Sequence, residues 1–175
     1  GIIEQIVEQK LVDIMLMSAS TSEVLTIHKR IFDNSPVTPA ARANDTTDIW
    51  LASGTGRYAT QPSLPFRTAT LDHIMCGKVA CAPEERTLGA DLGLYSITFN
   101  NDALLDRQSL EAYKEFRLEA EQKGFRHFLE VFEPNAPGDH RPADLGRFIA
   151  DHIVRALAGV TARGRPLFLK IPYHG

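Results

Sequence analysis

The chain has 175 residues, of which 43% are hydrophobic and 23% are charged, an ordinary composition for a globular protein. Its formal net charge of -3 argues against a dedicated nucleic-acid-binding protein, which would carry a concentrated basic face. We find no apolar run long enough to span a membrane and no signal peptide in the first residues, and we therefore expect one cytoplasmic domain over residues 1–175.

The first part of the chain alternates between helix and strand signals. The expected elements are a helix over 2–10, a buried strand over 11–18, a helix capped by Thr21 or Ser22, and a strand over 37–44. The last of these is the weakest, because Pro39 removes a hydrogen-bond donor from the strand.

Residues 45–90 are the least regular part of the sequence. Short helical or ordered pieces are expected only around 48–51 and 66–75. A long irregular stretch inside a compact domain is often functional. The sequence leaves open whether this one is a lid, an interface or an insertion.

The second part of the chain has clearer signals. The expected elements are a strand over 92–100, a helix over 106–123, a strand over 126–132, a turn-rich loop over 133–140, a helix over 142–158, and a buried strand around Lys170. Strands and helices that alternate with short connections predict a parallel α/β fold in a single domain.

The strand over 92–100 favours a barrel over an open sheet. Its aromatic and aliphatic side chains alternate with Ser96, Thr98 and Asn100. In a doubly wound sheet both faces would be apolar, whereas in a (β/α)8 barrel one face lines the interior, where catalytic residues collect. A complete barrel needs about 250 residues, and this chain supplies about five strands. We therefore predict an incomplete (β/α)8 TIM-type barrel.

The two cysteines, Cys76 and Cys81, do not form a recognisable metal motif. Their spacing is not C-x-x-C and no pair of histidines lies nearby, so we expect neither zinc nor any other metal. Reduced structural thiols in a cytosolic protein are the preferred interpretation.

Glu130 and Lys170 form the strongest candidate site. They occupy corresponding positions in FLEV (128–131) and FLKI (168–171), so adjacent strands in register would bring the two side chains together. A buried lysine loses hydration, which favours its neutral, nucleophilic form, and a neighbouring carboxylate can relay protons. A structural ion pair is the alternative for these residues alone.

The second half of the chain resembles the class I tagatose-bisphosphate aldolase family. The resemblance rests on residues 109–113 (SLEAY), 125–131 (FRHFLEV) and 168–170 (FLK). It implies a Schiff-base lyase in which Lys170 captures a small, typically phosphorylated sugar or keto substrate and Glu130 transfers protons. It also implies that the strands here are two to six of eight, so we expect a longer chain than these 175 residues.

Four further residues are candidates for substrate binding. Ser96 and Asn100 share the polar face of their strand and would orient hydroxyl groups, whereas Arg42 and Arg67 could hold a phosphate or a carboxylate. No cofactor is expected, and the oligomeric state, including a homo-oligomer, is left open.

Two other functions remain open. In a non-covalent isomerase or epimerase, Glu130 would be the base and Lys170 an electrophilic stabiliser. In a non-catalytic barrel, the site would bind a sugar phosphate or a partner protein. The second alternative is favoured by residues 92–96, which contain no lysine where the aldolase family has one on its fourth strand.

Overall fold

The computed structural model describes residues 1–136 and 141–174. Five parallel strands form the main sheet in the order β1-β2-β5-β6-β7. The strands are β1 (Ile14–Met17), β2 (Thr38–Arg42), β5 (Leu92–Thr98), β6 (Arg126–Phe132) and β7 (Leu169–Lys170). The predicted α/β class with a parallel sheet is confirmed.

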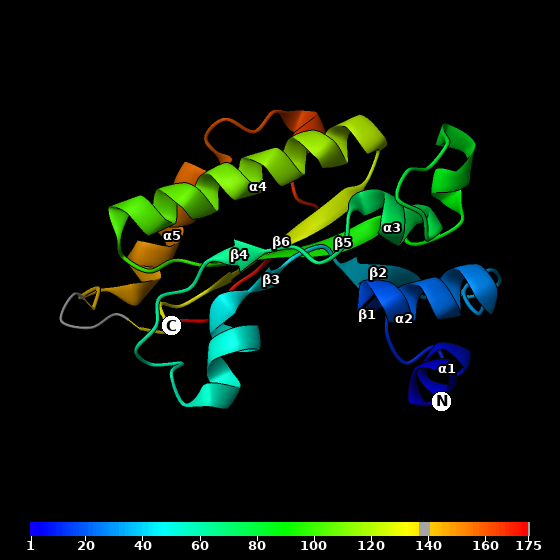
Figure 1. Ribbon diagram of the computed structural model, residues 1–175, viewed down its shortest axis with the longest axis horizontal. Helices are drawn as coiled ribbons and strands as arrows, with labels where there is room; N and C mark the ends of the chain where they lie inside the picture. The colour runs from blue at the N-terminus through cyan, green and yellow to red at the C-terminus, as the bar shows by residue number, and fades with distance from the viewer. Residues whose placement is uncertain (137–140, 175) are drawn as a thin grey trace.

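The first helix precedes the first strand, and the other helices and helical turns lie between strands along the chain (Figure 1). They are α1 (Ile2–Glu8), α2 (Ala19–Ser22), a π-helix over Glu23–His28, another over Asp48–Ala52, α3 (Leu71–Cys76), α4 (Ala103–Lys123) and α5 (Leu145–Leu157), with 3-10 turns over Ser53–Thr55, Pro83–Thr87 and Ala162–Gly164.

Helix α4 begins earlier than the sequence predicted because Asp102 caps it. The Asp102 carboxylate accepts hydrogen bonds from the backbone of Leu104 and Leu105 at 2.9 and 3.0 Å, which satisfies two N–H groups of the first turn. At the other end Gly124 adopts a left-handed conformation with φ 72°, as predicted for the stop. Similarly, the helix expected to start at Thr21 or Ser22 starts at Ala19, with Ser18 as its cap.

One face of the sheet packs against helices. Tyr95, Ile97 and Phe99 of β5 belong to the main hydrophobic cluster together with residues of α3, α4 and α5. Tyr95 lies with its ring centroid 4.6 Å from that of Phe116 on α4. This confirms the predicted alternation along β5, since the intervening side chains point to the opposite face.

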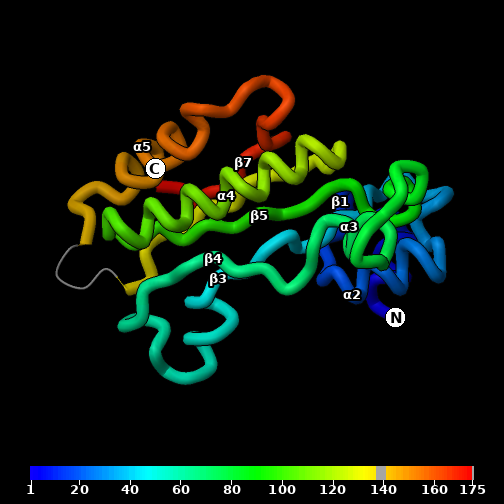
Figure 2. Tube along the Cα trace, turned by 45° about the horizontal axis from the view of Figure 1, so that its top comes forward, coloured from blue at the N-terminus to red at the C-terminus, as the bar shows by residue number. Residues whose placement is uncertain are grey.

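The opposite face carries a smaller apolar cluster and then polar side chains. Ala40, Leu92, Leu94 and Phe128 form the cluster near the amino-terminal ends of the strands. Towards the carboxyl ends, the face is approached by residues 45–66, which we call the covering segment. Figures 1 and 2 show this segment on the side of the sheet opposite α4.

The covering segment is a small folded unit. It starts with β3 (Asp45–Thr46) and ends with β4 (Pro65–Phe66), which pair as an antiparallel two-stranded sheet. The helix expected around 48–51 is present as the π-helix Asp48–Ala52, and the ordered piece expected around 66–75 contains α3. Much of the region that looked irregular therefore consists of short elements.

The described residues form an open sheet in which no closed barrel is seen, so the incomplete (β/α)8 barrel stays a prediction. Two other expectations are wrong. The strand around Lys170 was predicted to be buried, but β7 lies at the end of the sheet order and Leu167, Phe168, Leu169 and Ile171 are all exposed. The run of apolar residues predicted burial here because helices normally cover both faces of such a strand.

The second correction concerns the cysteines, which form a disulfide between Cys76 and Cys81 and are not reduced thiols. Cys76 ends α3, and Gly77 turns the chain back with φ 74°, which brings the two Cα atoms to 6.1 Å. Disulfides are rare in cytosolic proteins, so the cytoplasmic location stays a prediction.

Residues 137–140 of the loop expected over 133–140 lie outside the described residues. Among the residues that are described, we find no helix with the length and apolar character needed to cross a membrane.

Candidate functional site

Glu130 and Lys170 meet on adjacent strands. The two residues are register partners in β6 and β7, and Lys170 Nζ forms an ion pair with Glu130 Oε1. The Glu130 side chain is only 5% exposed, whereas the Lys170 side chain is 61% exposed. The predicted proximity is thus confirmed, but the predicted burial of the lysine is wrong.

This difference in exposure matters for the chemistry. Loss of hydration through burial no longer accounts for a reactive Lys170. What remains is a solvent-accessible amine held against a buried carboxylate, an arrangement in which a proton can pass directly between the two groups. The Lys170 side chain as a whole is exposed to solvent.

Ser96 fixes the second oxygen of Glu130. Ser96 is the register partner of Glu130 on β5, and its hydroxyl donates to Glu130 Oε2 at 3.0 Å. Ser96, Glu130 and Lys170 therefore form one row across three neighbouring strands, with each carboxylate oxygen assigned to a different partner. This brings together three of the predicted site residues.

Asn44 locks Ser96 in place from the other side. The side-chain amide of Asn44 donates to the Ser96 carbonyl at 2.8 Å, and its oxygen accepts from the Ser96 N–H at 2.6 Å. Strand β2 ends at Arg42, so the Asn44 side chain continues the pairing with β5 where backbone pairing stops. Asn44 is 2% exposed, so this pair of hydrogen bonds to the backbone is held rigidly.

The next polar level ties the covering segment to β5. Asp48 is buried and accepts from the hydroxyls of Thr98 at 3.1 Å and Ser63 at 2.8 Å. Asp48 and Ser63 were not predicted as site residues. The only signal in the sequence that could have indicated them is that they are polar residues of the irregular region. The polar face of β5 needs polar partners, and this region could supply them.

Asn100, predicted to contact substrate, holds the covering segment instead. Its side chain accepts from Ser63 N at 2.7 Å and donates to Ser63 O at 2.8 Å. Asp106 of α4 also accepts from the Asn100 backbone N–H at 2.6 Å. These bonds use the main hydrogen-bonding groups of a residue that is only 7% exposed.

The two predicted arginines lie in different places. Arg67 faces α4, where it forms an ion pair with Glu119 at 2.6 Å and stacks over Phe116, so the structure does not bring it to the Glu130–Lys170 pair. Arg42 lies on β2 beside Asp45 and Trp50. Burial raises the pKa of the Asp45 carboxyl, and the nearby Arg42 guanidinium opposes that shift.

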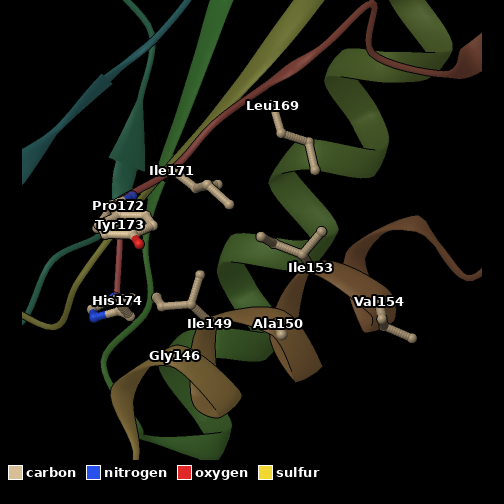
Figure 3. Close-up of a pocket in the computed structure, with 10 residues that line it drawn as sticks. All are labelled: Gly146, Ile149, Ala150, Ile153, Val154, Leu169, Ile171, Pro172, Tyr173 and His174. Carbon is tan, nitrogen blue, oxygen red and sulfur yellow. The ribbon is translucent and has the colours of Figure 1, made fainter.

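A cavity with mainly apolar walls lies elsewhere. It has a volume of about 520 Å³ and lies between α5 and the chain around β7, where Ile149 and Ile153 face Leu169 and Ile171 (Figure 3). Leu169 and Ile171 alternate with Lys170 and therefore point to the other face of the extended chain. The apolar groove is separate from the Glu130–Lys170 pair.

The comparisons with known proteins identify no family. No protein-family model matches the chain, and no curated protein matches it at a significant level. Within the described part of the chain, there is no group of three or more His, Cys, Asp and Glu residues placed to hold a metal ion.

Proposed function

We propose that this protein is a lysine-dependent carbon–carbon lyase of the class I aldolase type. Lys170 is the nucleophile, Glu130 the proton-transfer group, and Ser96 the residue that orients Glu130. The observation that carries the proposal is the contact between an exposed amine and a buried carboxylate whose other oxygen is held at 3.0 Å by Ser96.

The reaction begins with proton transfer from the Lys170 ammonium to Glu130, which frees the lone pair of Nζ. The amine adds to a substrate carbonyl, and the carbonyl oxygen leaves as water after receiving one proton from the amine and one from Glu130. A protonated imine results. Glu130, again ionised, then removes the proton of the β-hydroxyl group. The neighbouring carbon–carbon bond breaks, an aldehyde leaves, and the imine takes up the electron pair as an enamine.

The fold that we propose for this chemistry is part of a (β/α)8 barrel. Two observations support it: the strands follow one another in chain order, and the polar row lies on the face opposite α4 and α5. In such barrels catalytic side chains lie towards the carboxyl ends of several strands, facing inwards. Small sugar phosphates and keto acids are the substrate class that suits this site.

A non-covalent isomerase or epimerase is the second candidate. The direct ion pair between Lys170 and Glu130 favours it, because a charged lysine beside a base could stabilise an enediolate without forming a covalent bond. The two functions differ in what they require of Lys170. A nucleophile needs a primary amine, whereas electrostatic stabilisation needs only a positive charge.

Substitution of Lys170 by arginine separates the two functions. We would measure aldehyde release from a panel of ketose phosphates and keto acids, and isomerisation of the same compounds. An aldolase is expected to lose turnover by at least about a thousandfold in Lys170→Arg, since arginine cannot form the imine. The control is Lys114→Arg, an exposed lysine on α4, which should retain activity. Substantial turnover in Lys170→Arg would contradict the covalent mechanism.

A further inference from the structure

A cavity of about 360 Å³ lies beside the carboxyl ends of β1 and β2. Its walls include Ser18, Arg42, Asp45, Trp50 and Thr68. Ser18 caps α2, Arg42 ends β2, and Trp50 belongs to the covering segment. The cavity therefore lies at the junction of the sheet and the segment that covers it.

Arg42 is oriented within this cavity by two neighbours. Its Nε lies 3.5 Å from Asp45 Oδ1, and its guanidinium lies 5.4 Å from the centre of the Trp50 ring. The cation–π contact and the carboxylate restrict the movement of a long side chain that is only 27% exposed. Little conformational entropy would remain to be lost when a ligand binds.

The terminal nitrogens of Arg42 are available to a ligand. Its contact with Asp45 is made through Nε, and we find no hydrogen bond to either terminal nitrogen within residues 1–136 and 141–174. A guanidinium has four N–H donors on these two nitrogens, in a planar arrangement that matches two oxygens of a carboxylate or a phosphate.

Arg67 shows the contrast. Its Nε donates to the Ala43 carbonyl at 3.2 Å, and one terminal nitrogen forms the ion pair with Glu119. Both groups help to join the sheet to α4. Of the two arginines that the sequence indicated, only Arg42 keeps its terminal donors without a protein partner among the described residues and also lines a cavity.

Arg42 and Lys170 project from the same face of the sheet. Arg42 pairs in register with Leu94, two positions before Ser96, and Ser96 is aligned with Glu130 and Lys170. Two strands, β5 and β6, separate β2 from β7. At about 4.8 Å per strand, the two backbones are on the order of 14 Å apart along the sheet, and both side chains are long enough to shorten that gap.

We propose that the Arg42 cavity binds the anionic end of the substrate, a phosphate or carboxylate group, while the carbonyl group of the same molecule lies at Lys170. The second half of this statement rests on the proposed function, whereas the first half stands on the cavity and Arg42 alone. The substrate is then an extended molecule of several carbon atoms with a carbonyl group towards one end and an anion at the other. The covering segment supplies one wall of its binding site through Trp50.

Trp50 allows the proposal to be tested without any enzymatic assay. It is the only tryptophan in the chain, and it contacts the guanidinium to which the anion would bind. The protein would be titrated with inorganic phosphate and, separately, with acetate, at constant ionic strength. Intrinsic fluorescence and calorimetry would be recorded for the wild type and for Arg42→Gln, Arg42→Lys, Arg57→Gln and Lys170→Ala. Arg57 is an exposed arginine of the same covering segment and serves as the matched control.

Saturable binding of one of the two anions is expected in the wild type, and the anion that binds more tightly identifies the group as a phosphate or a carboxylate. Arg42→Gln should weaken binding by at least about tenfold, with Arg42→Lys in between because it keeps the charge but loses the planar fork. Arg57→Gln and Lys170→Ala should bind normally. Thermal unfolding would first be measured for every variant, and only variants that unfold at a temperature comparable to the wild type would be compared. Arg42→Lys, the more conservative substitution, provides a second variant at this position if Arg42→Gln does not fold.

Absence of saturable binding in the wild type would overturn the proposal, and so would binding that survives in a folded Arg42→Gln variant. Loss of binding in Lys170→Ala alone would place the anion at the lysine and would also overturn it. Failure of the aldolase mechanism gives a different result: anion binding at Arg42 would persist, while Lys170→Arg would keep its turnover.

Discussion

Single residues on this sheet divide according to the face they occupy. On β5 the aromatic and aliphatic side chains enter the helix-covered core, and the serine and threonine between them bind Glu130 and Asp48. Burial of a carboxylate is costly unless hydrogen bonds satisfy it. Ser96 and Lys170 together supply those bonds for Glu130, so the same contacts that make burial tolerable also position the carboxylate for proton transfer.

His127 makes stability depend on pH. It is 3% exposed, its Nε2 lies 2.9 Å from the Tyr113 hydroxyl, and burial, followed by the charge of Arg117, lowers its pKa from 6.5 to about 4. As pH falls below 6.5, the unfolded chain takes up this proton before the folded protein does. The stability present above that pH is therefore lost between 6.5 and about 4, by up to about 3 kcal/mol.

Urea unfolding at pH 7 and pH 4.5 would measure this loss, which should be much smaller in His127→Gln. His152 is the control with the opposite sign. Burial lowers its pKa, but hydrogen bonds to Asp106 and the Phe148 carbonyl outweigh burial and raise it overall. His152 thus adds stability at low pH that is lost as pH rises, and His152→Gln should make acid destabilisation steeper. Equal acid sensitivity in wild type and His127→Gln would contradict this account.

Among the site residues, sequence reasoning succeeded where a strand's alternation determined the answer. Ser96, Glu130 and Lys170 could be aligned because parallel strands have a side-chain period of two residues. Asn100 has the same parity, yet its amide is used by Ser63 of the covering segment. Periodicity gives the face of a side chain but not its partner, since the partner here lies 37 residues away.

At the scale of elements, Gly93 allows β5 to pack closely against the Phe125 ring and the backbone of β2. A Cβ atom at Gly93 would lie 2.7 Å from the Phe125 ring and 3.1 Å from the Ala41 carbonyl oxygen. Neither can retreat easily, because Phe125 is buried and Ala41 belongs to the adjacent strand β2. Gly93 therefore permits the packing that sets β5 between β2 and β6.

Gly93→Ala should lower the free energy of unfolding by about 1–3 kcal/mol, as expected for overpacking a tight site. Gly159→Ala is the matched control, since a Cβ there would meet nothing within 4 Å. Denaturant unfolding of both variants would test the expectation. If the two substitutions cost the same, the close approach around Gly93 would have no energetic consequence.

The disulfide links the end of α3 to the loop that follows. Cys76 and Cys81 are five residues apart, so the bond closes a short loop. The entropy of closing such a loop corresponds to about 2 kcal/mol. A Cys76→Ser, Cys81→Ser double variant should lose about that much stability, and adding a thiol reductant should destabilise the wild type but leave the double variant unchanged. A wild type insensitive to reductant would mean that the bond does not form in solution.

The covering segment shows why the least regular region could not be predicted. Its two strands are only two residues long each, and they pair across a stretch of helical turns. Its stability comes from polar bonds to distant residues, such as Asp48 to Thr98 and Ser63 to Asn100. Local propensity carries no information about such contacts. The long helix α4, in contrast, could be predicted because caps and periodicity are local signals.

For the whole molecule, the order of strands could be predicted because alternating strands and helices in a parallel sheet tend to place consecutive strands side by side. The exposure of β7 could not. The apolar sequence around Lys170 is typical of a buried strand. Whether the strand is buried, however, depends on which elements pack against it in the folded sheet, and here its apolar side chains are exposed. The consequence for function is direct: the lysine has its carboxylate partner and remains open to solvent.

The measurement that most directly tests the central claim is reduction of the protein with borohydride in the presence of carbonyl donors. Dihydroxyacetone phosphate and pyruvate would be the two probes, and peptide mass spectrometry would locate any adduct. We predict a stable secondary amine on Lys170, no adduct at that position in Lys170→Arg, and slower formation in Glu130→Gln, by roughly a hundredfold or more. A folded wild-type protein that forms no adduct with either donor, or forms it only on another lysine, would contradict the account.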